Sequence, residues 1–190
     1  GWIENDRLWV DNATDTGWGV YTYNRSWDSN NVSKITANTV TANDRFGSAV
    51  RLGTTGEYVY VGNPGQRQVQ VFANVAGVFT SNVTLSNTNA EFGGVIESQG
   101  NLLIVASPTS ANVHIYRHWA NAAITKIQTI KSANIAAVNS ISMSTDQHRL
   151  YIGDATNNIV ESYYTTNASW ANTAYTWTTT VTGTAATQFG

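Results

Sequence analysis

Histidines and carboxylates are the side chains of this sequence that could perform acid–base or metal chemistry. The histidines are His114, His118 and His148. We expect His114 and His118 on one face of one strand, where residues four apart are separated by about 13 Å. That separation is too large for a shared metal ion. The preferred interpretation is that each histidine is either hydrogen-bonded in the core or exposed to solvent.

Acidic residues form two close pairs near the N-terminus, Glu4 with Asp6 and Asp11 with Asp15. Both pairs stand beside turn residues, where aspartate commonly bonds the local backbone. A glycosidase needs two acids that face each other across a cleft, which a sequence by itself does not show. No nucleophile elbow or phosphate loop is present. The sequence therefore predicts no catalytic residue, no metal and no cofactor, and a protein that is not an enzyme.

Tryptophans offer a different chemistry, the stacking of an exposed indole on a sugar face beside Asn and Asp. The candidate glycan-binding residues are Trp18, Trp27, Trp119 and Trp170. The favoured alternative is that large aromatics fill the space between packed sheets, because aromatic burial dominates core energetics. Both interpretations remain open from the sequence.

Composition excludes several classes of function. Of the 190 residues 12% are charged, the net charge is -2 and no basic stripe occurs, which disfavours nucleic-acid binding. There is no cysteine, so disulfides, thiolate nucleophiles and Cys-ligated zinc are excluded. No apolar run approaches the roughly 20 residues that span a bilayer. Asn, Thr and Ser supply the polarity, and this balance leads us to expect an extracellular or virion-surface location.

A repeated pattern must position these residues. The stretch 46–72 opens with Phe-Gly, and its pattern returns at 92–116 and more weakly at 138–163. Phe92 follows Phe46 by 46 residues, and Val138 follows Phe92 by another 46. Each copy has an alternating apolar opening, a polar turn, a short apolar run and a second alternating run. Repeats of roughly 40 to 50 residues with four short strands each are typical of propeller blades.

The predicted fold is all-β, a β-propeller-type array of about four four-stranded antiparallel blades. The expected units are a degenerate first blade at 1–45, blades at 46–91 and 92–137, a degenerate blade at 138–188, and the start of a further repeat at 189–190. Four blades are few for a closed ring. We therefore expect a larger propeller, or strands supplied by a partner that protect the sheet edges. The run 101–106 is predicted to be buried on both faces, and 120–130 to contain an outer strand.

The copies resemble the FG-GAP repeats of integrin α-subunit propellers and of many bacterial and phage surface proteins. The resemblance rests on the Phe46-Gly47 and Phe92-Gly93 pairs. It also rests on the turns Gly62-Asn63-Pro64 and Ala106-Ser107-Pro108, where the family has Gly-Ala-Pro. Many members bind calcium between these motifs. The corresponding loops here offer one carboxylate or none, whereas calcium takes roughly six to eight oxygens, so the resemblance implies the metal-free kind found in large phage or bacterial structural proteins.

The function favoured at this point is a non-enzymatic structural or adhesive module of a larger extracellular or virion protein, such as a tail fibre. A glycan-binding, lectin-like module is the alternative, and a polysaccharide-cleaving enzyme is a third hypothesis. The expected partners are proteins or cell-surface glycans. The chain begins without Met and ends in Phe-Gly, so we expect a fragment of a longer chain, or an oligomer.

Overall fold

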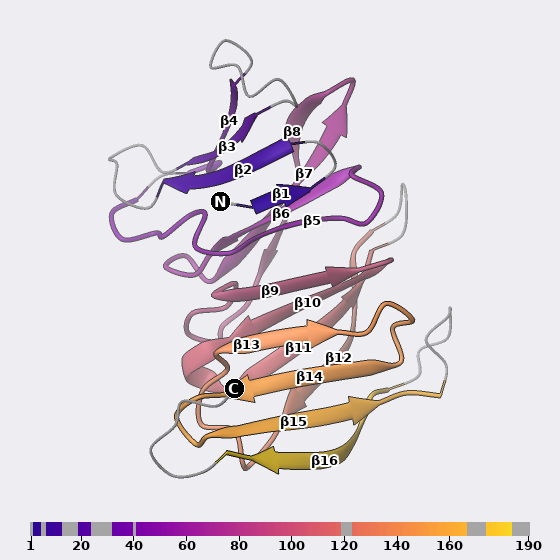
Figure 1. Ribbon diagram of the computed structural model, residues 1–190. Coiled ribbons are helices and arrows are strands. Elements are labelled where there is room, and N and C mark those ends of the chain that lie inside the picture. The colour runs from indigo at the N-terminus through magenta and orange to yellow at the C-terminus, as the bar shows by residue number, and fades with distance from the viewer. Residues whose placement is uncertain are drawn as a thin grey trace.

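The computed structural model describes residues 2–4, 7–12, 19–23, 32–39, 41–118, 123–166 and 174–183, with side chains from residue 34 onward. These residues form four four-stranded antiparallel sheets. The prediction of an all-β, propeller-type array of four blades is confirmed. Figure 1 shows the sheets following one another in chain order, from β1–β4 to β13–β16.

Each blade is a meander in which consecutive strands pair side by side. Blade 1 consists of β1 (Trp2–Glu4), β2 (Arg7–Asn12), β3 (Gly19–Tyr23) and β4 (Val32–Thr36). Blade 2 consists of β5 (Val50–Leu52), β6 (Tyr58–Asn63), β7 (Gln68–Val75) and β8 (Val78–Ser86). Blade 3 consists of β9 (Val95–Gln99), β10 (Leu102–Ser107), β11 (Asn112–Arg117) and β12 (Thr125–Lys131), with the 3-10 helix η2 (Pro108–Ser110) after β10. Blade 4 consists of β13 (Ser140–Met143), β14 (Arg149–Asp154), β15 (Ile159–Tyr164) and β16 (Thr176–Thr182).

The first strand of each of blades 2 to 4 lies on the axial side of the array. Strand β9 contacts both β5 and β13, and β9 and β13 run side by side in Figure 1. The fourth strands β8, β12 and β16 are largely exposed, as expected for the outer edge. The outer strand predicted within 120–130 is β12.

The Phe-Gly pairs of blades 2 and 3 have equivalent backbone geometry. Gly47 and Gly93 both have a φ of 93°, a conformation that favours glycine because a side chain would be strained there. Gly47 donates its N–H to the Gly62 carbonyl at 2.9 Å, and Gly93 donates to the Ala106 carbonyl at 3.0 Å. Each bond ties the entry of a blade to the end of its second strand.

Blade 4 has the same hydrogen bond at its start, although it lacks the Phe-Gly pair. Val138 is 1% exposed, beside 1% for Phe46 and 0% for Phe92, so a smaller apolar side chain fills the same place. Asn139 donates its N–H to the Gly153 carbonyl at 2.9 Å. The third copy is therefore a structural equivalent of the other two, although its sequence has diverged.

Strand β10 packs against both neighbouring blades. Leu103 and Val105 belong to the apolar cluster shared with blade 2, whereas Leu102 and Ile104 belong to the cluster shared with blade 4. Every residue of the strand is buried. The predicted burial of this run on both faces is thus confirmed, and β10 is the second strand of blade 3, next to β9.

The outward face of blade 4 is open. Tyr60 on β6 and Tyr151 on β14 occupy the same position, since each pairs with the middle of a first strand, opposite Arg51 and Ser142 respectively. Blade 3 covers Tyr60, which is 4% exposed, whereas Tyr151 is 37% exposed. Within the described residues, no further sheet covers this face of blade 4.

Candidate functional site

Polar side chains from adjacent blades meet on the inner strands. Arg51 is the middle residue of β5, and Glu97 is the middle residue of β9. The Arg51 Nε atom lies 3.3 Å from Glu97 Oε2, with the two side chains 44% and 21% exposed. Ser142 occupies the matching position of β13 and is exposed. We call Arg51, Glu97 and Ser142 the axial site, because it presents a cation, a carboxylate and a hydroxyl on three neighbouring inner strands.

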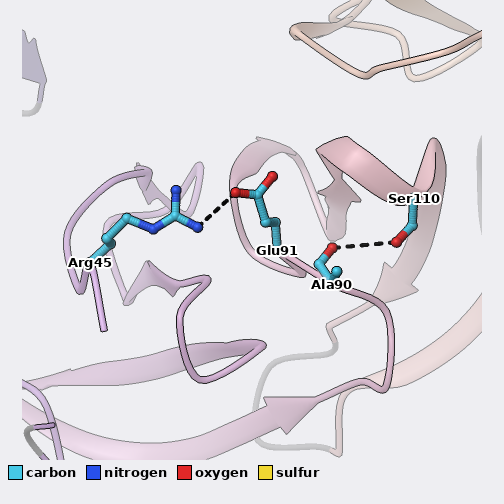
Figure 2. Close-up of polar contacts among 4 residues, drawn as sticks. All are labelled: Arg45, Ala90, Glu91 and Ser110. Carbon is cyan, nitrogen blue, oxygen red and sulfur yellow. Dashed lines mark hydrogen bonds and ion pairs between the residues drawn. The ribbon is translucent and has the colours of Figure 1, made fainter. Parts of the chain in front are cut away.

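A second ion pair with the same repeat spacing lies at the blade entries. The Arg45 guanidinium donates to Glu91 Oε1 at 2.8 Å across 46 residues of sequence. Figure 2 shows these two side chains pointing toward each other and the Ser110 hydroxyl reaching the Ala90 carbonyl. Arg45 and Glu91 both have positive φ, at 56° and 59°. This pair joins the entry turns of blades 2 and 3, so we assign it a structural role.

His118 is a buried interface residue. Its Nδ1 atom lies 2.7 Å from the Tyr60 hydroxyl, and its ring centroid is 4.1 Å from that of Tyr58. Burial lowers the pKa of His118, opposed in part by the Glu57 carboxylate. The neutral imidazole therefore joins blade 3 to blade 2.

His114 has separate partners on both ring nitrogens. The Thr129 hydroxyl lies 3.0 Å from Nδ1 and the Asn89 side-chain nitrogen 3.1 Å from Nε2. Burial, aided by the Lys126 charge, lowers the pKa of His114 to about 4. His114 and His118 thus serve separate contacts. No group of three or more His, Cys, Asp or Glu side chains that could hold a metal occurs in the part of the chain described.

A pocket of about 490 Å³ lies between the outer strands of blades 3 and 4. We call it the interblade pocket. Glu161, which is 0% exposed, is among its lining residues. Its carboxylate accepts hydrogen bonds from Ser132 Oγ at 2.8 Å, Asn134 Nδ2 at 3.0 Å and the Tyr163 hydroxyl at 2.6 Å. Burial and the Glu161 charge raise the pKa of Tyr163, so its hydroxyl stays protonated and donates.

The four tryptophans predicted to bind glycans, Trp18, Trp27, Trp119 and Trp170, lie outside the described residues. The predicted further repeat at 189–190 lies outside them too. Sequence reasoning did not find Arg51, Glu97 or Glu161. A signal for the first two was available, because opposite charges recur at one repeat position 46 residues apart.

Comparison with solved structures places the chain among propellers. No family model matches it, and no curated protein sequence does. The periplasmic gluconolactonase PpgL of Pseudomonas aeruginosa is 11% identical with a TM-score of 0.73, over 97% of this chain and 52% of that chain. A proposed 6-phosphogluconolactonase of Bacteroides fragilis is 15% identical with a TM-score of 0.70, over 90% of this chain and 50% of that one. The β-propeller domain of Cps50 (Swd1) from Myceliophteria thermophila is 7% identical with a TM-score of 0.68, over 95% of this chain and 56% of that one.

These identities establish the fold alone, and the chain spans about half the length of the structures that it matches. They nevertheless correct the expected function. The prediction of a non-enzymatic structural or adhesive virion module was wrong, because structures that share the fold include proteins described as lactonases. Polar groups such as Arg51 and Glu97 come together from inner strands of separate blades, 46 residues apart in the sequence, so no local motif announces them.

The resemblance to FG-GAP repeats stays a prediction, since none of these comparisons tests it. The same holds for the extracellular or virion-surface location. Among the described residues, no helix has both the length and the apolar character needed to cross a bilayer.

Proposed function

We propose that this chain is part of a β-propeller hydrolase that opens a lactone of a sugar acid. The observation that carries the proposal is the placement of Arg51 beside Glu97 on adjacent inner strands, at 3.3 Å and open to solvent. The fold likeness to structures described as gluconolactonase and 6-phosphogluconolactonase supports the choice of substrate class.

The chemistry of lactone opening matches the groups of the axial site. Water attacks the lactone carbonyl carbon, negative charge develops on the carbonyl oxygen, and the ring C–O bond breaks as the leaving oxygen takes up a proton. A carboxylate such as Glu97 can accept the proton of the attacking water. A guanidinium such as that of Arg51 can stabilise the developing oxyanion. Arg51 also suits an anionic substituent on the substrate, because its planar fork matches phosphate and carboxylate.

On this proposal, a closed propeller around the axial site needs further blades. Tyr151 is 37% exposed at a position where its counterpart Tyr60 is 4% exposed. A further blade, from a longer chain or from a protein partner, would bury this face and complete the wall around the axis. A location outside the cytoplasm, favoured by the low charge content, belongs to the same proposal.

The test is hydrolysis of gluconolactone and 6-phosphogluconolactone by the full-length product that contains this chain. We expect Glu97→Gln to lower the rate by about 10²-fold or more, as for loss of a general base. Glu91→Gln is the matched control, because it breaks an ion pair of the same repeat spacing away from the axial site and should leave the rate unchanged. Absence of hydrolysis above the spontaneous rate, or an unchanged rate for Glu97→Gln, would overturn the proposal.

A further inference from the structure

Two buried histidines lie at one interface, the contact between blades 2 and 3. His114 is paired with Val105 in the ladder of β10 and β11, and Val105 belongs to the apolar cluster shared with blade 2. The His114 ring packs edge-on against Phe92 of that cluster, with ring centroids 5.4 Å apart. His118 follows four residues later and contacts Tyr60 of blade 2, with ring centroids 5.8 Å apart. The two histidines are 3% and 6% exposed, so this interface encloses two imidazoles.

The neighbours of His114 favour its neutral ring. Its hydrogen-bond partners are the Thr129 hydroxyl and the Asn89 amide. The Asn89 nitrogen can only donate, so protonation of His114 Nε2 would set two donors against each other. Burial, aided by the repulsion from the Lys126 ammonium, lowers the pKa of His114 to about 4. A charged His114 is therefore poorly accommodated while the two blades are in contact.

His118 is enclosed by side chains of blade 2. The Tyr60 hydroxyl lies 2.7 Å from its Nδ1 atom, and the Tyr58 ring centroid lies 4.1 Å from that of His118. Burial raises the pKa of Tyr60, so this hydroxyl stays protonated. Burial lowers the pKa of His118, and the Glu57 carboxylate opposes that shift only in part. Because separation of the blades would return the ring to water, the charged form of His118 also favours an opened interface.

The interface between blades 3 and 4 is held by carboxylates instead. In the linker 132–139, the Ala136 N–H donates to Asp154 Oδ2 at 2.6 Å and the Asn134 side chain donates to Glu161 Oε1 at 3.0 Å. Burial by itself would raise the pKa of Asp154, but hydrogen bonds from four backbone N–H groups outweigh it and lower the pKa below the ordinary 3.8. Asp154 therefore keeps its charge at pH values where a histidine in water is already protonated.

We propose that the contact between blades 2 and 3 is an acid-sensitive interface, which opens when His114 and His118 take up protons while blades 3 and 4 stay together. Both histidines have a lowered pKa in the closed protein, so the opened state binds the extra protons. The contact is thus fully stable above about pH 6.5 and weakens as the pH falls toward 4. The remaining histidine, His148, stacks on Tyr164 of its own blade. This device does not depend on the proposed lactone hydrolysis.

The test measures how fast a buried thiol in each interface reacts, in the full chain, which has no cysteine of its own. Val71→Cys places a thiol in the cluster shared by blades 2 and 3, and Val113→Cys places one in the cluster shared by blades 3 and 4. The two valines are matched, at 0% and 1% exposed. The reagent is a dipyridyl disulfide, and the same variants unfolded in urea correct for the pH dependence of the reaction itself.

We expect the corrected rate for Val71→Cys to rise by about tenfold or more between pH 7 and pH 5, because two suppressed protonations are released on opening. The rate for Val113→Cys should stay within about twofold over the same range. Adding His114→Gln and His118→Gln to the Val71 variant should abolish the rise, since glutamine keeps hydrogen-bonding groups but does not titrate. No rise for Val71→Cys, equal rises for the two thiols, or a rise that survives both glutamines would overturn the proposal.

A second measurement needs no variant and decides the case if the doubly substituted protein does not fold. The ring protons of His114 and His118 are followed by NMR in the unmodified protein as the pH is lowered. We expect both rings to give the signals of the neutral form at pH 6.5, where half of the imidazoles of an unfolded chain are charged. Titration of both rings around pH 6.5 would overturn the proposal, because the closed interface would then not oppose their charge.

Discussion

Leu102 and Leu103 are consecutive residues of β10 that lie in different apolar cores, one shared with blade 4 and the other with blade 2. They are 2% and 0% exposed. Successive side chains of a strand point to opposite faces, and a blade has a neighbour on each face. Each leucine therefore supports a separate blade-to-blade contact.

Truncation of either leucine should destabilise the protein. Leu102→Ala and Leu103→Ala should each lower the free energy of unfolding by about 2–5 kcal/mol, because each removes packed methyl groups and leaves a cavity. Denaturant unfolding followed by circular dichroism measures this. Val83→Ala, at a position 37% exposed, should change stability by less than about 0.5 kcal/mol. A leucine variant as stable as the Val83 variant would contradict two-sided burial of β10.

Gly93 should tolerate no side chain. A Cβ atom there would lie 2.4 Å from the Gln68 carbonyl oxygen, and the positive φ adds strain of about 1–3 kcal/mol. Gly93→Ala should therefore lower the thermal midpoint markedly. Gly100→Ala is the matched comparison: its φ is also positive, but its Cβ would meet the flexible end of the Gln147 side chain, which can move. An equal or larger loss for Gly100→Ala would show that the backbone contact at Gly93 is not the cause.

His114 should make stability depend on pH. The pKa of His114 is lowered by burial to about 4 in the folded protein, against about 6.5 when unfolded. Between these values the unfolded chain binds the extra proton, so stability is fully present above about pH 6.5 and is lost as the pH falls toward 4. The loss should be on the order of 3 kcal/mol. Unfolding curves from pH 7 to 4 measure it.

The control for this prediction is His114→Gln. That side chain can still bond to Thr129 or Asn89 but does not titrate. We expect the variant to lose part of the pH dependence between 6.5 and 4, whatever its stability at pH 7. A profile as steep as that of the parent protein would assign the pH dependence to other groups.

The Arg51–Glu97 pair should respond to charge reversal. Glu97→Arg places two like charges on adjacent inner strands, and Arg51→Glu in the same molecule restores opposite charges. Because the side chains are 44% and 21% exposed, the single change should cost about 0.5–1 kcal/mol and the double change should recover most of it. The cost should shrink in 1 M salt, where charges are screened. A double variant no more stable than the single one would show that the two charges are not coupled.

Much of the architecture could be predicted from the sequence, because each blade is built by local rules. The Phe46 and Phe92 openings and the 46-residue interval reflect one strand–turn pattern used again, and each copy folds into one four-stranded meander. The apolar run of β10 predicts burial on both faces, because a strand packed between two neighbouring sheets needs apolar side chains on each side. The amino-acid sequence thus determined the strand class, the repeat and the four blades that the described residues form.

The candidate sites depended on the tertiary structure. Arg51 meets Glu97, and Ser132 meets Glu161, across 46 and 29 residues of sequence, through the stacking of one blade on the next. No local pattern encodes such contacts, since the separation and twist of neighbouring sheets fix which side chains converge. For that reason the sequence by itself suggested a molecule without chemistry. The packed blades, by contrast, bring the Arg51 guanidinium and the Glu97 carboxylate together on the inner strands and form an open polar pocket between the outer strands of blades 3 and 4.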